Sequence, residues 1–312
     1  MTETFDYIIV GAGSAGCLLA NRLSADPGKR VLLLEAGKRD NYHWIHIPVG
    51  YLYCIGNPRT DWMYQTAPSA GLNGRTLRYP RGKSLGGCSS INGMIYMRGQ
   101  ARDYDGWARV TGDDAWSWDR SLPDFMAHED HHRLDHGADP QTGDNMRFSD
   151  LHGSGGEWRI EKQRLRWDIL DDFAKAATQT GIAPTDDFNT GDNAGVGYFD
   201  VTQRSGWRWN TAKAFLRPVM DRPNLSVWTE AQAERLLWDA QDPRRCAGVQ
   251  VQRAGQSVAV MAGAEVILSA GAIGSPQILQ LSGVGPAALL RDRGIAVRHD
   301  LTGVGQNLQD HL

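Results

Sequence analysis

The feature that most constrains the fold of this chain is a glycine-rich turn between two apolar segments near its start. Residues 6–10 are a β-branched apolar run, residues 11–16 read GAGSAG, and residues 17–26 have helical periodicity. A second apolar run at residues 31–34 ends in Glu35. A strand, a tight turn, a helix and a second strand within about thirty residues form the βαβ unit that binds a dinucleotide. The sequence therefore predicts an α/β fold with a doubly wound sheet.

Each residue of the turn has an expected role toward the dinucleotide. Gly11 allows a sharp exit from the first strand, and Gly16 lets the helix approach the sheet closely. Gly13 has no Cβ that would hold a pyrophosphate away from the backbone. Ser14 and Ala15 offer N–H groups to a phosphate at the positive end of the helix.

Glu35 indicates which dinucleotides the site accepts. Its carboxylate can accept two hydrogen bonds from the adenosine ribose, and it would repel a 2′-phosphate, so NADP is disfavoured. The fingerprint alone leaves both NAD and FAD open. The structural alternative is a glycine-rich turn in an unrelated fold, which the strands, the helix and the acidic residue in register disfavour.

A second glycine-rich stretch, RGKSLGGCSSINGM at residues 81–94, has almost no side chain that could attack a substrate or bind a metal. The apolar segment that follows it indicates an ordered, half-buried loop instead of a flexible linker. Glycine-rich backbone can reach the polar edge of a large planar ligand without intervening side chains.

These stretches together resemble the glucose-methanol-choline (GMC) family of FAD-dependent oxidoreductases, most closely its choline dehydrogenase-like branch. The resemblance is carried by residues 11–16, 31–37, 80–99, 271–286 and 303–311, in that order. It implies an FAD-binding α/β domain with an inserted α+β substrate domain, and a C-terminal part of the family's fold that is missing from this chain.

The resemblance also implies which residues hold the FAD. It places six residues along the pyrophosphate and the flavin ring, namely Gly86, Gly87, Asn92, Gly93, Met94 and Ile95. Ala233 is expected to contact the adenine through its backbone, Ala270 to form a second turn beside the flavin, and Ala36 to contact the cofactor next to Glu35. Members that bind flavin covalently carry a histidine at the position of Ile91, so the FAD is expected to be non-covalent.

The implied reaction is the oxidation of an alcohol, in which the substrate carbon gives a hydride to flavin N5 and a histidine takes the hydroxyl proton. The family places that histidine in its C-terminal third. No residue of this chain is therefore assigned as catalytic, and the chain alone is expected to be inactive. Two alternatives stay open: an FAD-retaining lyase of the hydroxynitrile lyase type, and a non-catalytic flavin-binding remnant.

The expected domain organisation follows from the order of the elements. Residues 1–150 are assigned to the first part of the FAD-binding domain, residues 151–222 to a partial substrate domain, and residues 223–312 to the returning strands and helix. Residues 167–181 have the apolar periodicity of an amphipathic helix. Ser275 and the following proline are typical of a helix start, as a cap and an N1 residue.

A histidine-rich segment follows a predicted helix in the first half of the chain. Its ionisable residues are His128, Glu129, Asp130, His131, His132 and His136. The i, i+4 spacing of His128 and His132 is also found in zinc sites. We interpret the segment as the solvated end of a helix and expect no metal there.

Composition limits the remaining classes of partner. The net charge of −3 and the pI near 6.3 argue against a nucleic-acid partner. Four scattered cysteines without a CxxC pair and an acidic N-terminus without a signal-like segment favour a cytoplasmic protein. No apolar run is long enough to span a membrane. The expected partners are a small alcohol and an electron acceptor that the sequence does not identify.

Overall fold

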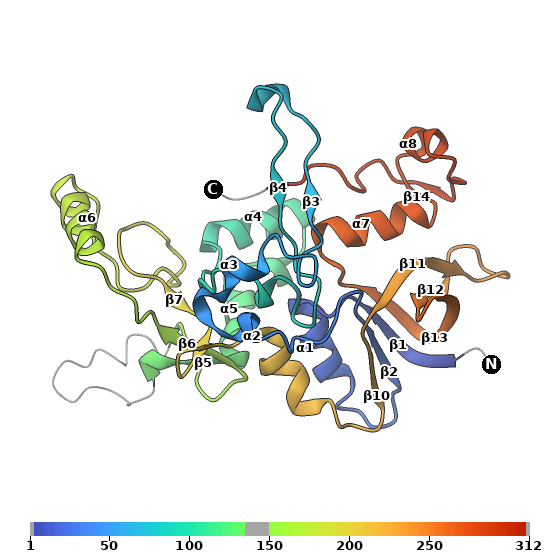
Figure 1. The fold of residues 1–312 in the computed structure, drawn as a ribbon, viewed down its shortest axis with the longest axis horizontal. Coiled ribbons are helices and arrows are strands. Elements are labelled where there is room, and N and C mark those ends of the chain that lie inside the picture. Colours follow the sequence, from blue (N-terminus) through green and yellow to red (C-terminus); the bar gives the residue numbers. More distant parts are fainter. Residues whose placement is uncertain (1–2, 135–149, 310–312) are drawn as a thin grey trace. The chain divides into compact units, whose positions relative to one another are not determined.

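The computed structural model describes residues 3–134 and 150–309. Contacts divide the chain into two compact units, Met1–Ile91 with Thr211–Leu312, and Asn92–Asn210 (Figure 1). The chain leaves the first unit once and returns to it, as expected of an inserted domain. This division does not fall at the expected boundaries of residues 150 and 222, and the functional assignment of those domains stays a prediction.

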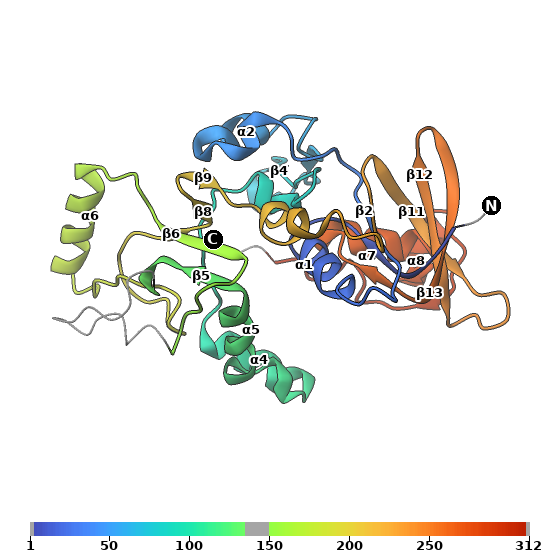
Figure 2. The same ribbon diagram turned by 90° about the horizontal axis from the view of Figure 1, so that it is seen from below.

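The first unit is built on a six-stranded sheet in the order β10-β2-β1-β13-β12-β11, whose strands are labelled in Figure 1. Four of them, β2, β11, β12 and β13, are also labelled in Figure 2. The strands of this sheet are β1 (Glu3–Val10), β2 (Val31–Leu34), β10 (Leu225–Trp228), β11 (Ala231–Trp238), β12 (Cys246–Arg253) and β13 (Gln256–Leu268). The first four in that order are parallel, and β12 and β11 continue antiparallel. The expected α/β class with a parallel sheet is confirmed.

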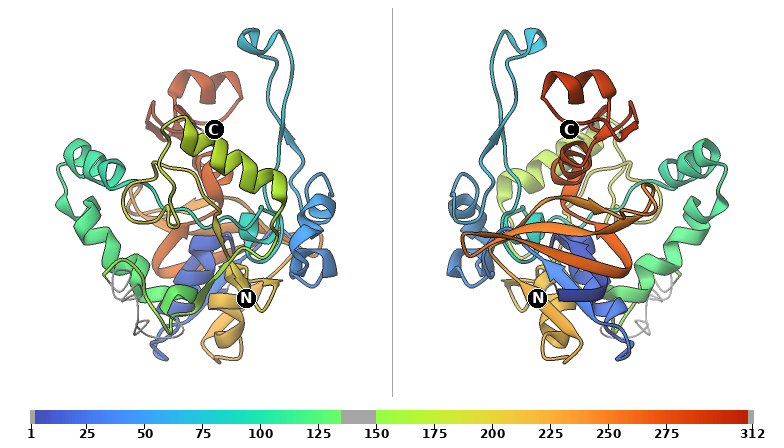
Figure 3. Two further views of the ribbon diagram at one scale, coloured as in Figure 1. Left: turned by 90° about the vertical axis from the view of Figure 1, so that its left-hand side faces the viewer. Right: turned by 90° about the vertical axis from the view of Figure 1, so that its right-hand side faces the viewer.

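Strand β2 and the last three residues of β1 are buried, and their sequences are continuous apolar runs. Ile8 and Ile9 of β1 and the whole of β2 have almost no exposed surface. Strands buried on both faces read as continuous apolar runs, in contrast to alternating ones. Helix α1 (Ser14–Leu23), blue in Figure 3, packs on β1 and β2 through small residues such as Gly16 and Ala20, which allow a close approach.

Helix α7 (Gly271–Leu281) begins four residues before the expected start at Ser275. Ser275 is not its N-cap, and Pro276 lies inside the helix. The serine hydroxyl instead accepts the backbone N–H of Ala270 at 3.0 Å, so it stabilises the turn that precedes the helix. The cap prediction was wrong because this hydroxyl satisfies a donor five residues upstream.

Short elements complete the first unit. They are α2 (His43–His46), α3 (Tyr51–Cys54), β3 (Tyr64–Gln65), β4 (Arg78–Tyr79), β14 (Val284–Gly285), α8 (Ala287–Asp292) and β15 (His299–Asp300). Strands β3 and β4 pair antiparallel and form a hairpin, and β14 pairs with β15. None of the helices in the described ranges has the length and apolar character needed to cross a bilayer.

The second unit is α+β, as expected for the insertion. Its elements are α4 (Ala101–Thr111), α5 (Trp118–His128), β5 (Glu129–His131), β6 (Trp158–Lys162), α6 (Asp168–Gln179), β7 (Asp200–Val201), β8 (Gln203–Arg204) and β9 (Trp207–Arg208). Helix α6 confirms the helix predicted over 167–181. Its apolar face is exposed, however, with Ile169 and Phe173 each 68% exposed.

The histidine-rich segment is largely buried, so the expectation of a solvated helix end was wrong. Helix α5 ends at His128, and the chain continues as strand β5, which pairs parallel with β6. The side chains of Glu129 and His131 have no exposed surface. His136 lies outside the described residues.

Glu129 is buried because a set of charged partners surrounds it. Arg98 and Tyr96 both donate to its Oε1, and Nδ1 of His152 lies 3.1 Å from its Oε2. The other ring nitrogen of His152 lies 2.8 Å from a carboxylate oxygen of Asp187. Because both ring nitrogens face carboxylates, these contacts favour the doubly protonated form of His152.

His131, His132 and Asp200 form a neighbouring cluster whose possible ligand atoms lie within 4.8 Å of one another. Nε2 of His132 lies 2.9 Å from Asp200, and the Arg133 guanidinium donates to the same carboxylate at 3.3 Å. The carboxylate thus already has the Arg133 guanidinium and a His132 ring nitrogen as partners. The expectation that no metal binds stays a prediction.

Candidate cofactor site

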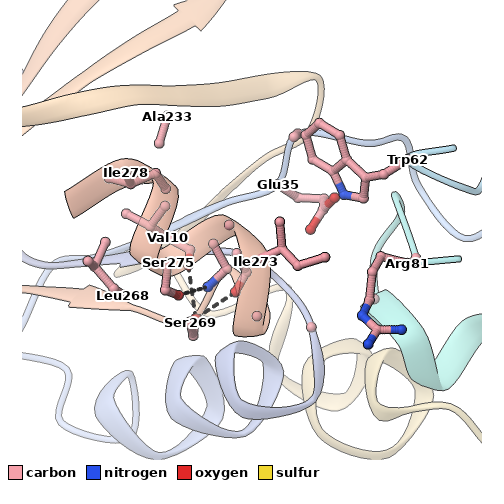
Figure 4. Close-up of a pocket in the computed structure, with 18 of the residues that line it drawn as sticks. Val10, Glu35, Trp62, Arg81, Ala233, Leu268, Ser269, Ile273, Ser275 and Ile278 are labelled. Carbon is pink, nitrogen blue, oxygen red and sulfur yellow. Dashed lines mark hydrogen bonds between the residues drawn. The ribbon is translucent and has the colours of Figure 1, made fainter. Parts of the chain in front are cut away.

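The main cavity of the first unit, about 440 Å³, lies where three parallel strands end (Figure 4). Val10, Leu34 and Leu268, the last residues of β1, β2 and β13, line it. Ligands of open α/β sheets bind outside the carboxyl ends of the strands. The volume falls in the range of small-molecule sites and suits the nucleotide portion of a dinucleotide.

The glycine turn that opens α1 lines this cavity, and two of its glycines are fixed by close packing. Gly11 has a φ of +102°, and a Cβ there would lie 2.6 Å from the Ser269 carbonyl oxygen. A Cβ on Gly16 would lie 1.9 Å from the carbonyl oxygen of Gly11. A Cβ on Gly13, which lines the cavity, would meet no atom within 4 Å. The space at Gly13 is open, and its contact with a pyrophosphate stays a prediction.

Glu35 reaches the cavity from the end of β2, with its side chain buried. One carboxylate oxygen accepts the backbone N–H of Gly37 at 2.8 Å, and the other accepts that of Ala12 at 3.1 Å. Burial raises the pKa of this carboxyl to about 7, although the two N–H donors and the charge of Lys83 act in the opposite direction. The remaining lone pairs are available to ribose hydroxyls.

The second glycine-rich loop packs directly onto the first. Gly87 lines the cavity with a φ of +52°, and a Cβ there would lie 2.7 Å from the Cα of Gly13. Gly86, with a φ of +87°, does not line the cavity but donates its N–H to the Ala12 carbonyl at 2.8 Å. The two loops are therefore held together by their backbones.

The other expected contact residues divide into two groups. Ser14, Ala15, Ala36, Ala233 and Ala270 line the cavity. Asn92, Gly93, Met94 and Ile95 belong to the second unit and are not among its lining residues. There, the Asn92 side chain accepts the N–H of Met94 at 3.1 Å. Direct contact of each of these residues with FAD stays a prediction.

Sequence reasoning missed one wall of the cavity. Trp62, Tyr64 and Arg81 line it from the β3–β4 hairpin (Figure 4). No periodic pattern or motif distinguishes these residues, and the available signal was an arginine at the start of the second glycine-rich stretch. Lining residues of α7 were missed as well, namely Ile273, Gln277 and Ile278.

Gly13 and Gly16 are expected to respond differently to the same substitution. Gly13→Ala places a methyl group in the space for the pyrophosphate, so FAD binding falls at least tenfold, while the free energy of unfolding falls by about 1 kcal/mol or less because Gly13 is the N-cap of α1. Gly16→Ala forces a methyl group against backbone and costs about 1–3 kcal/mol of stability. Thermal unfolding measures the stability of both variants, and flavin titration measures their affinity for FAD. Equal stability losses would contradict the assignment of Gly13 to the cofactor.

Comparison with known proteins gives relatives over the whole chain. The chain is 46% identical over 312 residues to an alcohol dehydrogenase [acceptor] of Pseudomonas putida, covering 99% of this chain and 53% of that protein. It is 43% identical to the oxygen-dependent choline dehydrogenase of Photobacterium profundum, covering 100% and 52%. The chain thus spans about half the length of the curated relatives it matches.

Solved structures agree with the sequence relatives. Pyridoxine 4-oxidase from Mesorbium loti superposes with a TM-score of 0.86 at 35% identity, covering 96% of this chain and 55% of that one. An FAD-dependent oxidoreductase from Chaetomium thermophilum gives the same TM-score at 31% identity, with 98% and 52% covered. FAD is the cofactor that suits the cavity, its glycine turn and Glu35. The GMC oxidoreductase family model matches residues 5–312, and the chain belongs to that family.

Proposed function

We propose that the protein to which this chain belongs oxidises a primary or secondary alcohol with FAD, in the manner of choline dehydrogenase. The observation that carries this proposal is the cavity at the strand ends, whose glycine turn and buried Glu35 suit the ADP half of FAD. The alcohol and choline dehydrogenases among the relatives support the substrate class. FAD, when bound, supplies the acceptor for the alcohol's hydride.

The residues of this chain bind and orient the cofactor. Glu35 accepts hydrogen bonds from the ribose hydroxyls. The N–H groups at Gly13, Ser14 and Ala15 donate hydrogen bonds to the pyrophosphate at the start of α1. Ala233 contacts the adenine through its backbone. No residue of the chain is proposed to take the proton of the alcohol.

Reduction of the flavin by an alcohol tests the proposed function. The chain is loaded with FAD under anaerobic conditions and mixed with choline, benzyl alcohol or a short aliphatic alcohol, beside the full-length protein. Loss of the flavin's visible absorbance in the full-length protein supports alcohol oxidation. Stable binding of FAD by the full-length protein with no reduction by any of these alcohols would favour the lyase or the non-catalytic alternative. The expected inactivity of the 312-residue chain alone is tested in the same assay.

We propose that the FAD is held non-covalently. Ile91 packs in a buried apolar cluster with Ile45 and Cys54, and its side chain has no nucleophile. Acid precipitation of the FAD-loaded protein is therefore expected to release all flavin into the supernatant. Flavin fluorescence that stays with the denatured protein band on a gel would contradict this.

We also propose a cytoplasmic location, because the four cysteines, all within the described residues, are thiols and not disulfides. Two of them, Cys17 and Cys54, are buried, and burial raises the pKa of the Cys17 thiol to about 12. Such thiols are inert packing residues. The proposed substrate is a small alcohol. The electron acceptor is oxygen or another molecule.

A further inference from the structure

The β3–β4 hairpin forms a wall of the cofactor cavity and carries the positive charge of that wall. Its arms pair from the bridge between Asp61 and Gly82 outward, and the N–H of Trp62 donates to the Arg81 carbonyl at 2.9 Å. Trp62 and Tyr64 stack nearly parallel, with interplanar angle 5° and centroids 5.7 Å apart. Figure 4 shows Trp62 and Arg81 on the same side of the cavity.

The base of this hairpin is rigid because a buried carboxylate holds it. One oxygen of Asp61 accepts the N–H groups of Arg81 at 3.1 Å and Met63 at 3.0 Å. The other oxygen accepts the N–H of Gly56 at 2.8 Å. The backbone of Arg81 is thereby fixed at the rim of the cavity, and little ordering of the chain remains when a ligand binds.

Two contacts hold the guanidinium of Arg81 in place, but they use only some of its hydrogen-bond donors. It lies over the Tyr79 ring, 3.9 Å from the centroid, and one of its nitrogens donates to the Pro80 carbonyl at 2.8 Å. An arginine side chain has five N–H donors. Within the part of the chain that the structure describes, the other donors have no protein acceptor and are available to an anion.

The charges around the cavity match the parts of a dinucleotide. Among its lining residues in the described ranges, Glu35 is the acidic side chain and Arg81 the basic one. The helix start at Gly13 contributes only partial charge from its N–H groups. A carboxylate suits a ribose diol, and a planar guanidinium suits phosphate oxygens.

We propose that Arg81 binds the pyrophosphate of FAD and supplies the full counter-charge that the glycine turn lacks. This inference rests on the proposed function, because it takes FAD as the ligand. It predicts that Arg81 contributes to the binding of ligands with a pyrophosphate and contributes nothing to the binding of adenosine.

The test compares FAD, ADP and adenosine as ligands of the FAD-free chain. Flavin fluorescence quenching measures FAD, and calorimetry measures the other two. Arg81→Gln keeps a planar group that can bond the Pro80 carbonyl but removes the charge. It is expected to weaken the binding of FAD and ADP about ten- to a hundred-fold and to change the affinity for adenosine by no more than about twofold. Arg81→Lys keeps a point charge and is expected to lose less affinity for FAD and ADP than Arg81→Gln.

The matched control is Arg75→Ala, which removes the same charge from an exposed position on the same hairpin. It is expected to bind all three ligands like the unaltered chain. Unchanged ADP and FAD binding by Arg81→Gln would overturn the inference, and so would an equal loss of adenosine binding, which would indicate a packing role. If the unaltered chain binds neither FAD nor ADP, the proposed function fails together with this inference.

Discussion

Replacing Arg98 with alanine is expected to lower the free energy of unfolding by about 3–5 kcal/mol. The side chain of Arg98 is almost fully buried and pairs with Glu129, which has no exposed surface. Removing one member of a buried ion pair leaves the other charge without compensation, and that uncompensated charge is the source of the cost. Arg98 also donates to the Leu151 carbonyl at 2.8 Å, which would lose its donor.

His152 makes this network sensitive to pH as well. Burial by itself would lower the pKa of His152, but its hydrogen bonds to Asp187 and Glu129 outweigh burial and raise the pKa. A histidine whose pKa is raised on folding stabilises the protein below its unfolded pKa, and this contribution disappears as the pH rises through the folded value. The stability lost in Arg98→Ala is therefore measured below the unfolded histidine pKa of about 6.5, where this contribution is fully present.

Urea unfolding of the unaltered chain and the variant measures the Arg98 effect. Arg102→Ala is the matched control, because Arg102 is an exposed arginine close by in the sequence, and it is expected to change stability by about 0.5 kcal/mol or less. A loss below about 1 kcal/mol for Arg98→Ala would show that water reaches Glu129 and compensates its charge.

The part of the site that could be predicted from the sequence is the part made by local patterns. The strand, turn, helix and strand at residues 3–34 lie where the periodicity placed them, because glycines in tight contact and apolar strands leave few other conformations. Gly13, Glu35 and Gly87 line one cavity, and their contact with FAD stays a prediction. Each of these residues belongs to a short motif whose geometry is fixed within a few positions of the chain.

The hairpin wall and the buried network could not be predicted in the same way, because they depend on contacts distant in sequence. Trp62 and Arg81 reach the cavity only through strand pairing. Glu129 meets Arg98 across 31 positions and His152 across 23. Charged residues are seldom buried without partners. Without knowledge of those partners, the histidine-rich segment was interpreted as surface.

The second large expected effect concerns Glu35 in the FAD-free protein. Its pKa of about 7, against an ordinary value of 4.5, means that the folded state holds a proton that the unfolded state releases between these values. The free energy of unfolding is therefore expected to fall as the pH rises from about 4.5 to about 7, with a contribution of about 3 kcal/mol from this group. The cause is burial, which penalises the ionised carboxylate.

This pH dependence is tested by measuring the free energy of unfolding of the FAD-free protein and of two variants between pH 5 and pH 8, at steps of about half a pH unit. Glu35→Gln removes the titrating group and is expected to abolish the contribution, so the variant gains stability relative to the unaltered chain as the pH rises. Glu265→Gln removes an exposed carboxylate from β13 and is expected to keep the original pH dependence. If Glu35→Gln and Glu265→Gln show the same dependence, Glu35 is ionised throughout, and its carboxylate is available to the ribose without any cost of deprotonation.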